Sequence, residues 1–209
     1  MSSPFRRRRV LLTAAAALPL FTLALPASSL GTPAPTRLRG TIETLGAERL
    51  VLATRGDERV ELTLAPNLVV TEVFPVAFAD IQPNSFVGAG AVPQPDGTQR
   101  AVAVLLFPES MRGTGEGHRP ADFLPDGTMT NATVAGVAAA PDGRPLRVTY
   151  PAGEQTIVVP PEAPVFSMRP GTRDLLVLGA LVTLTAQAVD GKPVATRVSA
   201  GRNGFAPPY

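Results

Sequence analysis

Residues 79–104 read ADIQPNSFVGAGAVPQPDGTQRAVAV, and residues 173–198 read RDLLVLGALVTLTAQAVDGKPVATRV. The second stretch follows the first at an offset of 94 residues, and several positions match in type. The matching pairs are Asp80 with Asp174, Ile81 with Leu175, Asp96-Gly97 with Asp190-Gly191, Ala101 with Ala195, and Val104 with Val198. One offset shared by this many positions indicates an internal repeat.

A second pair of segments lies upstream of these two stretches. GTIETLGAERLVLATRGDERVELTL starts at Gly40, and ATVAGVAAAPDGRPLRVTYPAGEQTIVV starts at Ala132. In the first, Val60, Leu62 and Leu64 alternate with polar residues, which is the period of a strand covered on one face. Asp-Gly pairs at 96, 142 and 190 supply residues that tolerate positive φ, as tight hairpins require. Each half therefore predicts a meander of short strands.

The composition favours the same fold class. The chain has 209 residues, 44% of them hydrophobic, and its 23 Pro and 19 Gly leave little room for long helices. Closing short strands into a barrel also removes exposed sheet edges. We predict an all-β protein, a tandem repeat of two small OB-like closed barrels at 40–107 and 131–201, with a Gly-rich linker at 108–130. A single sandwich intertwined from both halves is the alternative.

The N-terminus has the order of a secretory signal peptide. Four consecutive arginines at 6–9 precede an apolar run at 10–25, and small residues follow. The predicted signal occupies 1–29, a flexible segment occupies 30–39, and a tail occupies 202–209. The arginines fit both the general and the twin-arginine export routes. The predicted location is periplasmic, and an uncleaved signal that anchors the protein in the inner membrane is the alternative.

Charge and cysteine content limit the classes of partner. Without residues 1–29 the chain has 15 basic and 17 acidic residues, a net charge of about −2, so nucleic acid is not an expected partner. The absence of cysteine from the sequence excludes disulfides and thiol chemistry. The apolar run is shorter than the roughly 20 residues of a membrane span, which argues against a polytopic membrane protein.

The linker contains the residues that hint at chemistry. Residues 107–134 read FPESMRGTGEGHRPADFLPDGTMTNATV and include the single histidine of the chain, His118. Glu116 and His118, with Asp122 nearby, offer oxygen and nitrogen ligands to a divalent metal such as Zn²⁺. In the alternative interpretation, the polar residues only fix the linker across both barrels through hydrogen bonds and ion pairs. The candidate residues for a ligand or linker site are Arg112, Glu116, His118, Arg119 and Asp122.

Two catalytic patterns in the linker are weak. GTGEG lacks the Lys-Ser/Thr of a phosphate-binding loop, and no helix is expected to follow it. Ser110, His118 and Asp122 supply the residue types of a hydrolase triad without a nucleophile-elbow motif. Hydrolysis is therefore only a minor alternative.

The residues also carry a family resemblance. The pattern D-[IL]-x-x-[GNL]…D-G…A-x-x-V resembles a bacterial secreted domain of unknown function, which implies a small OB-like barrel. With MRGTGEGHRP, TMTNATV and GRNGFAPP, residues 40–208 resemble a proteobacterial exported family whose members are sometimes labelled metal transporter permeases. That label conflicts with the several spans that a permease needs. Ala121 and Tyr209 depart from the family pattern, which usually has an aromatic residue and methionine there.

The sequence as a whole predicts a non-catalytic periplasmic binding or structural protein. A small ligand, an envelope polymer or an envelope protein are the expected kinds of partner. A metal-binding accessory protein that uses Glu116 and His118 is the alternative function. The sequence does not specify the oligomeric state.

Overall fold

The computed structural model describes residues 34–54, 56, 58–138 and 143–208. The predicted signal peptide and the Asp142 turn position lie outside the described residues. The described part is all-β and forms one 12-stranded sheet that closes into barrels, so the predicted all-β barrel fold is confirmed. Among the described residues, none of the helices has the length and apolar character needed to span a membrane.

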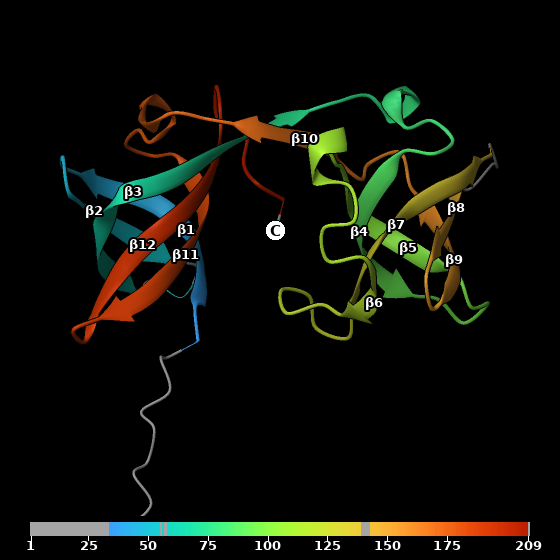
Figure 1. The fold of residues 1–209 in the computed structure, drawn as a ribbon, viewed down its shortest axis with the longest axis horizontal. Helices are drawn as coiled ribbons and strands as arrows, with labels where there is room; N and C mark the ends of the chain where they lie inside the picture. Colours follow the sequence, from blue (N-terminus) through green and yellow to red (C-terminus); the bar gives the residue numbers. More distant parts are fainter. Residues whose placement is uncertain (1–33, 55, 57, 139–142, 209) are drawn as a thin grey trace, which may run out of the picture. The chain divides into compact units, whose positions relative to one another are not determined.

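The first barrel combines strands from the two ends of the described chain (Figure 1). Its strands are β1 (Thr36–Leu45), β2 (Arg49–Thr54), β3 (Arg59–Pro75), β11 (Leu181–Val189) and β12 (Lys192–Gly201). They pair in the order β12-β11-β1-β2-β3, and a parallel pairing of β12 with β3 closes the ring. Alternating side chains point inward, so the core contains Ile42, Leu50, Leu52, Leu62 and Leu184.

The second barrel lies within the middle of the sequence. Its strands are β4 (Phe86–Pro93), β5 (Gln99–Leu106), β7 (Thr128–Val137), β8 (Arg144–Tyr150) and β9 (Gly153–Val159). They pair in the order β5-β4-β7-β8-β9, and a short parallel pairing, Gln99 opposite Ile157 and Arg100 opposite Val158, closes the ring. Its core includes Val87, Val104, Val134, Leu146 and Ile157.

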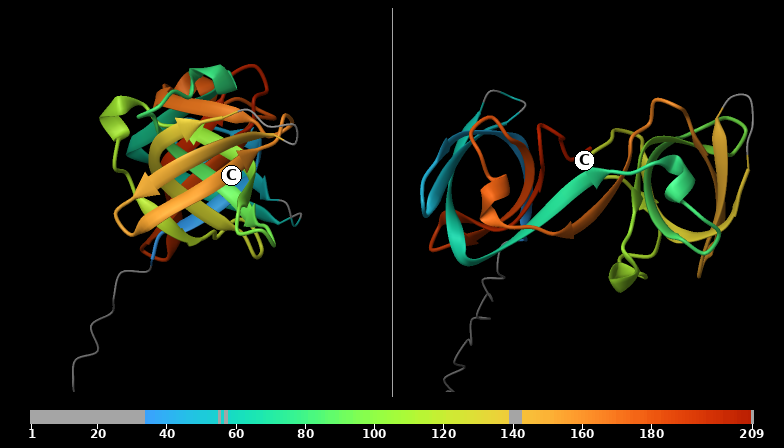
Figure 2. Two further views of the ribbon diagram at one scale, coloured as in Figure 1. Left: turned by 90° about the vertical axis from the view of Figure 1, so that its right-hand side faces the viewer. Right: turned by 90° about the horizontal axis from the view of Figure 1, so that it is seen from above.

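One further strand joins the hydrogen-bonded systems of both barrels. β10 (Val165–Pro170) pairs antiparallel with the end of β3 and parallel with β5 (Figure 2). Short 3₁₀ turns, η1 (Phe78–Asp80) and η3 (Arg173–Leu175), precede β4 and β11 respectively. Both barrels therefore share one design: a three-strand meander whose third strand pairs in parallel with the last strand of a hairpin.

The hairpin of each barrel comes from the other half of the sequence. Segment 40–107 contributes β1, β2 and β3 to the first barrel but β4 and β5 to the second. Segment 131–201 contributes β7, β8 and β9 to the second barrel but β11 and β12 to the first. The boundaries 40–107 and 131–201 thus do not each enclose a barrel. The physical reason is that β3 continues as an extended strand of 17 residues alongside β10 instead of turning back after the meander.

The predicted hairpin turns are confirmed where the structure describes them. Gly97 adopts φ +85° between β4 and β5, and Asp190 and Gly191 adopt φ +50° and +74° between β11 and β12. Positive φ at both central residues suits a two-residue hairpin and explains the Asp-Gly sequence there.

Candidate functional site

The predicted linker 108–130 is largely built onto the second barrel. It contains a 3₁₀ turn η2 (Glu109–Met111) and a short strand β6 (Gly117–Pro120), which pairs antiparallel with β7. Gly115 and Gly117 adopt φ +55° and +129°, conformations that glycine reaches without steric cost. Two of the glycines in this segment therefore set the entry into β6.

His118 lies on β6 and contacts the second barrel. Its Nδ1 is 2.8 Å from Oγ1 of the buried Thr130, the residue opposite it in the β6–β7 pairing. Its ring stacks on Tyr150 at the end of β8, with 6.3 Å between centroids and 19° between planes. The sequence interpretation missed Tyr150, because only the pairing of β8 with β7 brings it near His118.

The other polar candidates of the linker mostly form local contacts. Arg112 donates to both carboxylate oxygens of Glu109, at 2.6 and 2.7 Å, and to the carbonyl of Asn84 at 2.8 Å. The hydrogen bond from Arg112 lowers the pKa of Glu109 and raises that of Arg112. Arg119 donates to the carbonyl of Gly115 at 2.8 Å. Of these bonds, the one to Asn84 attaches the linker to the residues just before β4, and the others fix the conformation of the linker itself.

The loop after β6 reaches the first barrel. Nη1 of Arg37 on β1 lies 3.5 Å from Oδ2 of Asp122, and the Arg39 guanidinium lies over the Phe123 ring, 5.2 Å from its centroid. We call this pair of contacts the loop clasp. Asp122 is one of the predicted site residues, but its partner Arg37 on β1 was not predicted.

The described residues do not gather the ligands that a metal site requires. Within this part of the chain, no group of three or more His, Cys, Asp or Glu side chains is placed to hold a metal ion. Asp122 pairs with Arg37, which leaves Glu116 and His118 as the metal candidates, and Nδ1 of His118 already contacts Thr130. The partners of His118 and Asp122 in these contacts, Thr130 and Arg37, are not residues of the hydrolase triad considered above. The metal hypothesis stays a prediction.

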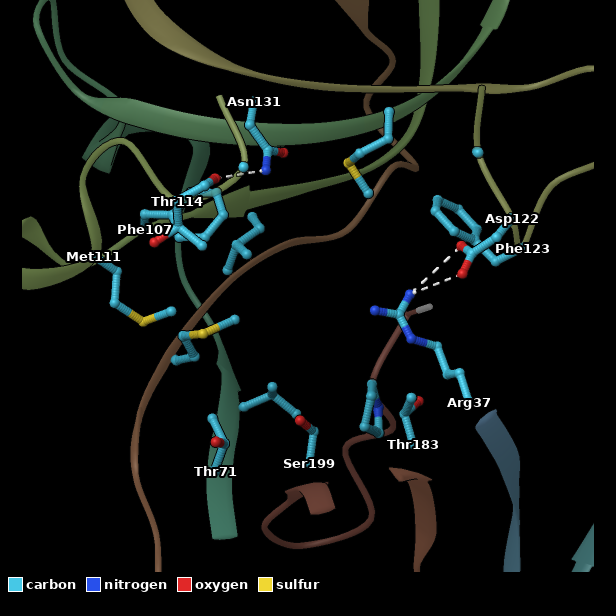
Figure 3. A pocket seen from close by; sticks show the side chains of 18 of the residues that line it. Arg37, Thr71, Phe107, Met111, Thr114, Asp122, Phe123, Asn131, Thr183 and Ser199 are labelled. Atoms are coloured by element: carbon cyan, nitrogen blue, oxygen red, sulfur yellow. Dashed lines mark hydrogen bonds and ion pairs between the residues drawn. The ribbon is translucent and has the colours of Figure 1, made fainter. Parts of the chain in front are cut away.

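A cavity of about 620 Å³ lies between the outer surfaces of the two barrels (Figure 3). The linker, β10 and the C-terminal segment also contribute to its lining. We call it the inter-barrel cavity. It is of the size that small-molecule sites usually have. The predicted site residues Arg119 and Asp122 line it, whereas Arg112, Glu116 and His118 are not among its lining residues.

One wall of the inter-barrel cavity is apolar. Phe107 and Phe166 belong to a buried cluster against which Met111 and Met168 pack. Met129 also contributes, so all three methionines that follow Met1 line this cavity. Methionine is unbranched and polarizable and adapts to ligands of different shape. Two of these methionines, Met111 and Met129, lie within the predicted linker, but Met168 is distant in sequence.

The other wall is polar and lies on the outer face of the first barrel. Thr71, Ser199 and Thr183 are successive neighbours across β3, β12 and β11. Arg197, Thr185 and Arg37 form the next row across β12, β11 and β1. Figure 3 shows Thr71, Thr183 and Ser199 across the cavity from Phe107 and Asn131. The sequence interpretation missed this wall, because its residues come together only after the halves exchange hairpins.

A tight contact shapes the floor of the cavity. Asn131 of β7 is buried and donates from Nδ2 to the carbonyl of Thr114 at 2.9 Å. A Cβ on Gly88 of β4 would lie 2.8 Å from Oδ1 of Asn131 and 2.9 Å from the Phe107 ring. Glycine at 88 therefore lets β4 approach both side chains.

Comparison of the chain with protein-family models, curated proteins and solved structures finds no match.

Proposed function

We propose that this chain is an exported, non-catalytic binding protein that holds a small ligand in the inter-barrel cavity. The observation that carries the proposal is the cavity itself, in which an apolar wall of Phe and Met side chains faces a wall of Arg, Thr and Ser side chains. Small-molecule sites combine apolar side chains with a few placed polar groups that orient the ligand, and this cavity has a wall of each kind.

The location and the family belong to the same proposal. The basic, apolar and small-residue order of residues 1–29 supports export to the periplasm, and the motifs between 40 and 208 support the resemblance to an exported family with OB-like domains. The loop clasp supports the view that the linker fixes the cavity by spanning both barrels.

Occlusion of the cavity tests the proposal. The neutral fluorescent probe 1-aminoanthracene should bind saturably to the wild type. Ser199→Trp should weaken that binding at least tenfold, because the indole projects from the polar wall and occupies the cavity. Thr149→Trp places the same side chain at an exposed position of β8 outside the cavity and should leave probe binding unchanged. No saturable binding, or equal binding by both variants, would refute the proposal.

A further inference from the structure

The charge of the inter-barrel cavity narrows the class of ligand. Arg37, Arg119 and Arg197 line it, and Asp122 is its one acidic lining residue among the described residues. Asp122 already faces Arg37. Arg119 bonds to a backbone carbonyl, which leaves its charge unbalanced, and within the described chain Arg197 has no ion pair. The cavity thus has a surplus of positive charge in a chain whose part after the predicted signal is slightly acidic.

The polar wall provides donors beside these charges. Thr185 lies directly between Arg197 and Arg37 in the strand pairing, and Thr183 and Ser199 occupy the adjacent row. Guanidinium groups and hydroxyls on one face donate hydrogen bonds to carboxylate or phosphate oxygens, and such charge-assisted bonds are stronger than neutral ones. A cationic ligand would meet repulsion at this wall.

The apolar wall requires that the ligand also have an apolar body. A small inorganic anion would satisfy the arginines but would leave the half-buried Met111, Met129 and Met168 side chains in contact with water. An apolar chain or ring removes that surface from water, which is favourable roughly in proportion to its area.

We infer that the ligand is an amphipathic anion, an apolar body with one carboxylate or phosphate head group that contacts Arg197 and the neighbouring hydroxyls. This inference rests on the proposed function, because it assigns the chemistry of the same cavity. The head lies against the first barrel, and the apolar body lies against the Met and Phe side chains.

Displacement of 1-aminoanthracene by ten-carbon competitors, all below their critical micelle concentrations, tests the inference. Decanoate or decyl phosphate should displace the probe at a concentration at least tenfold lower than decanol and decyltrimethylammonium, and acetate should not displace it. Comparison of the two anions separates a carboxylate from a phosphate head group. Rising salt should reduce the advantage of the anions, since salt screens charges that are exposed to solvent.

A charge variant assigns the selectivity to this wall. Arg197→Gln should lower the affinity ratio of decanoate to decanol at least threefold, whereas Arg147→Gln, on the exposed face of β8, should not change it. Equal displacement by decanol and decanoate, or an unchanged ratio in Arg197→Gln, would overturn the ligand class while probe binding still supported the cavity. Absence of saturable probe binding would refute the proposed function itself.

Discussion

Glu72 on β3 and Arg169 on β10 face each other through two hydrogen bonds. Arg169 donates from Nη2 to Oε1 at 2.9 Å and from Nε to Oε2 at 3.2 Å. Arg202, just after β12, donates to the same Oε1 at 3.3 Å, and the Glu72 side chain is only 7% exposed. One carboxylate thus ties β10 and the C-terminal segment to the first barrel.

Acid should weaken this connection. Hydrogen bonds from Arg169 and then Arg202 lower the pKa of Glu72 below its ordinary value of about 4.3. The stabilisation from Glu72 is therefore complete above about pH 4.3 and is lost as the pH falls through the lowered pKa. We expect Glu72→Gln to be less stable than the wild type at pH 7, with the difference shrinking below about pH 4. Thermal melts across this range measure the effect.

A surface pair provides the control for Glu72. Glu61 pairs with Arg49 at 3.1 Å, but both side chains are more than 60% exposed. Exposed pairs contribute little, so Glu61→Gln should change the melting temperature only slightly at every pH. If the difference in melting temperature between Glu72→Gln and the wild type stays the same down to pH 2.5, the assignment of the acid sensitivity to Glu72 is wrong.

The loop clasp should depend more on its aromatic contact than on its ion pair. The Arg37 and Asp122 side chains are 51% and 67% exposed, so a double-mutant cycle to alanine should give a coupling of less than about 1 kcal/mol. Phe123→Ala removes both packing and the contact with Arg39, and should lower the free energy of unfolding more than Asp122→Ala does. Denaturant unfolding of the variants measures both quantities, and the reverse order would contradict the expectation.

The barrels could be predicted from the sequence, but their strand membership could not. Alternating residues such as Leu62 and Leu64 and the Asp-Gly turns specify strands and hairpins locally. Exchange of the hairpins keeps the same types of neighbour for every strand, because the two halves carry matching patterns. The choice depends on whether the chain turns back or continues after β3, and the pairing of β3 with β10 decides it.

The same exchange limits prediction of the site. The linker drew attention through His118, whose partners Thr130 and Tyr150 belong to the second barrel. The inter-barrel cavity instead combines linker residues with Arg197 and Ser199 from β12. The sequence interpretation assigned this strand to the second barrel, but it belongs to the first. Residues at such distances in sequence share no local periodicity, so no pattern could reveal the polar wall.

His118 should act chiefly through its contact with Thr130. Thr130→Val leaves Nδ1 of His118 without this partner and should lower the free energy of unfolding by about 1–3 kcal/mol. His118→Ala should also destabilise, and the two effects should not add because the residues are in contact. Excess zinc should shift the wild type and His118→Ala equally. A zinc-dependent rise in melting temperature that occurs only in the wild type would favour the metal hypothesis for Glu116 and His118.

The two barrels should unfold together, because they share β10 and the buried cluster beside it. Leu52 lies in the core of the first barrel and Leu146 in that of the second, and both are fully buried. Truncating either to alanine should cost about 2–5 kcal/mol. β10 pairs with β3 of the first barrel and with β5 of the second, and one buried cluster contains Val73 of β3, Leu105 of β5 and Phe166 of β10. Unfolding of either barrel therefore exposes apolar surface of the other. Leu52→Ala and Leu146→Ala should therefore both lower the midpoint temperature of one common calorimetric transition, whose calorimetric and van't Hoff enthalpies are equal. Separation into two transitions in either variant would show that the barrels unfold independently and would contradict the coupling through β10 and its cluster.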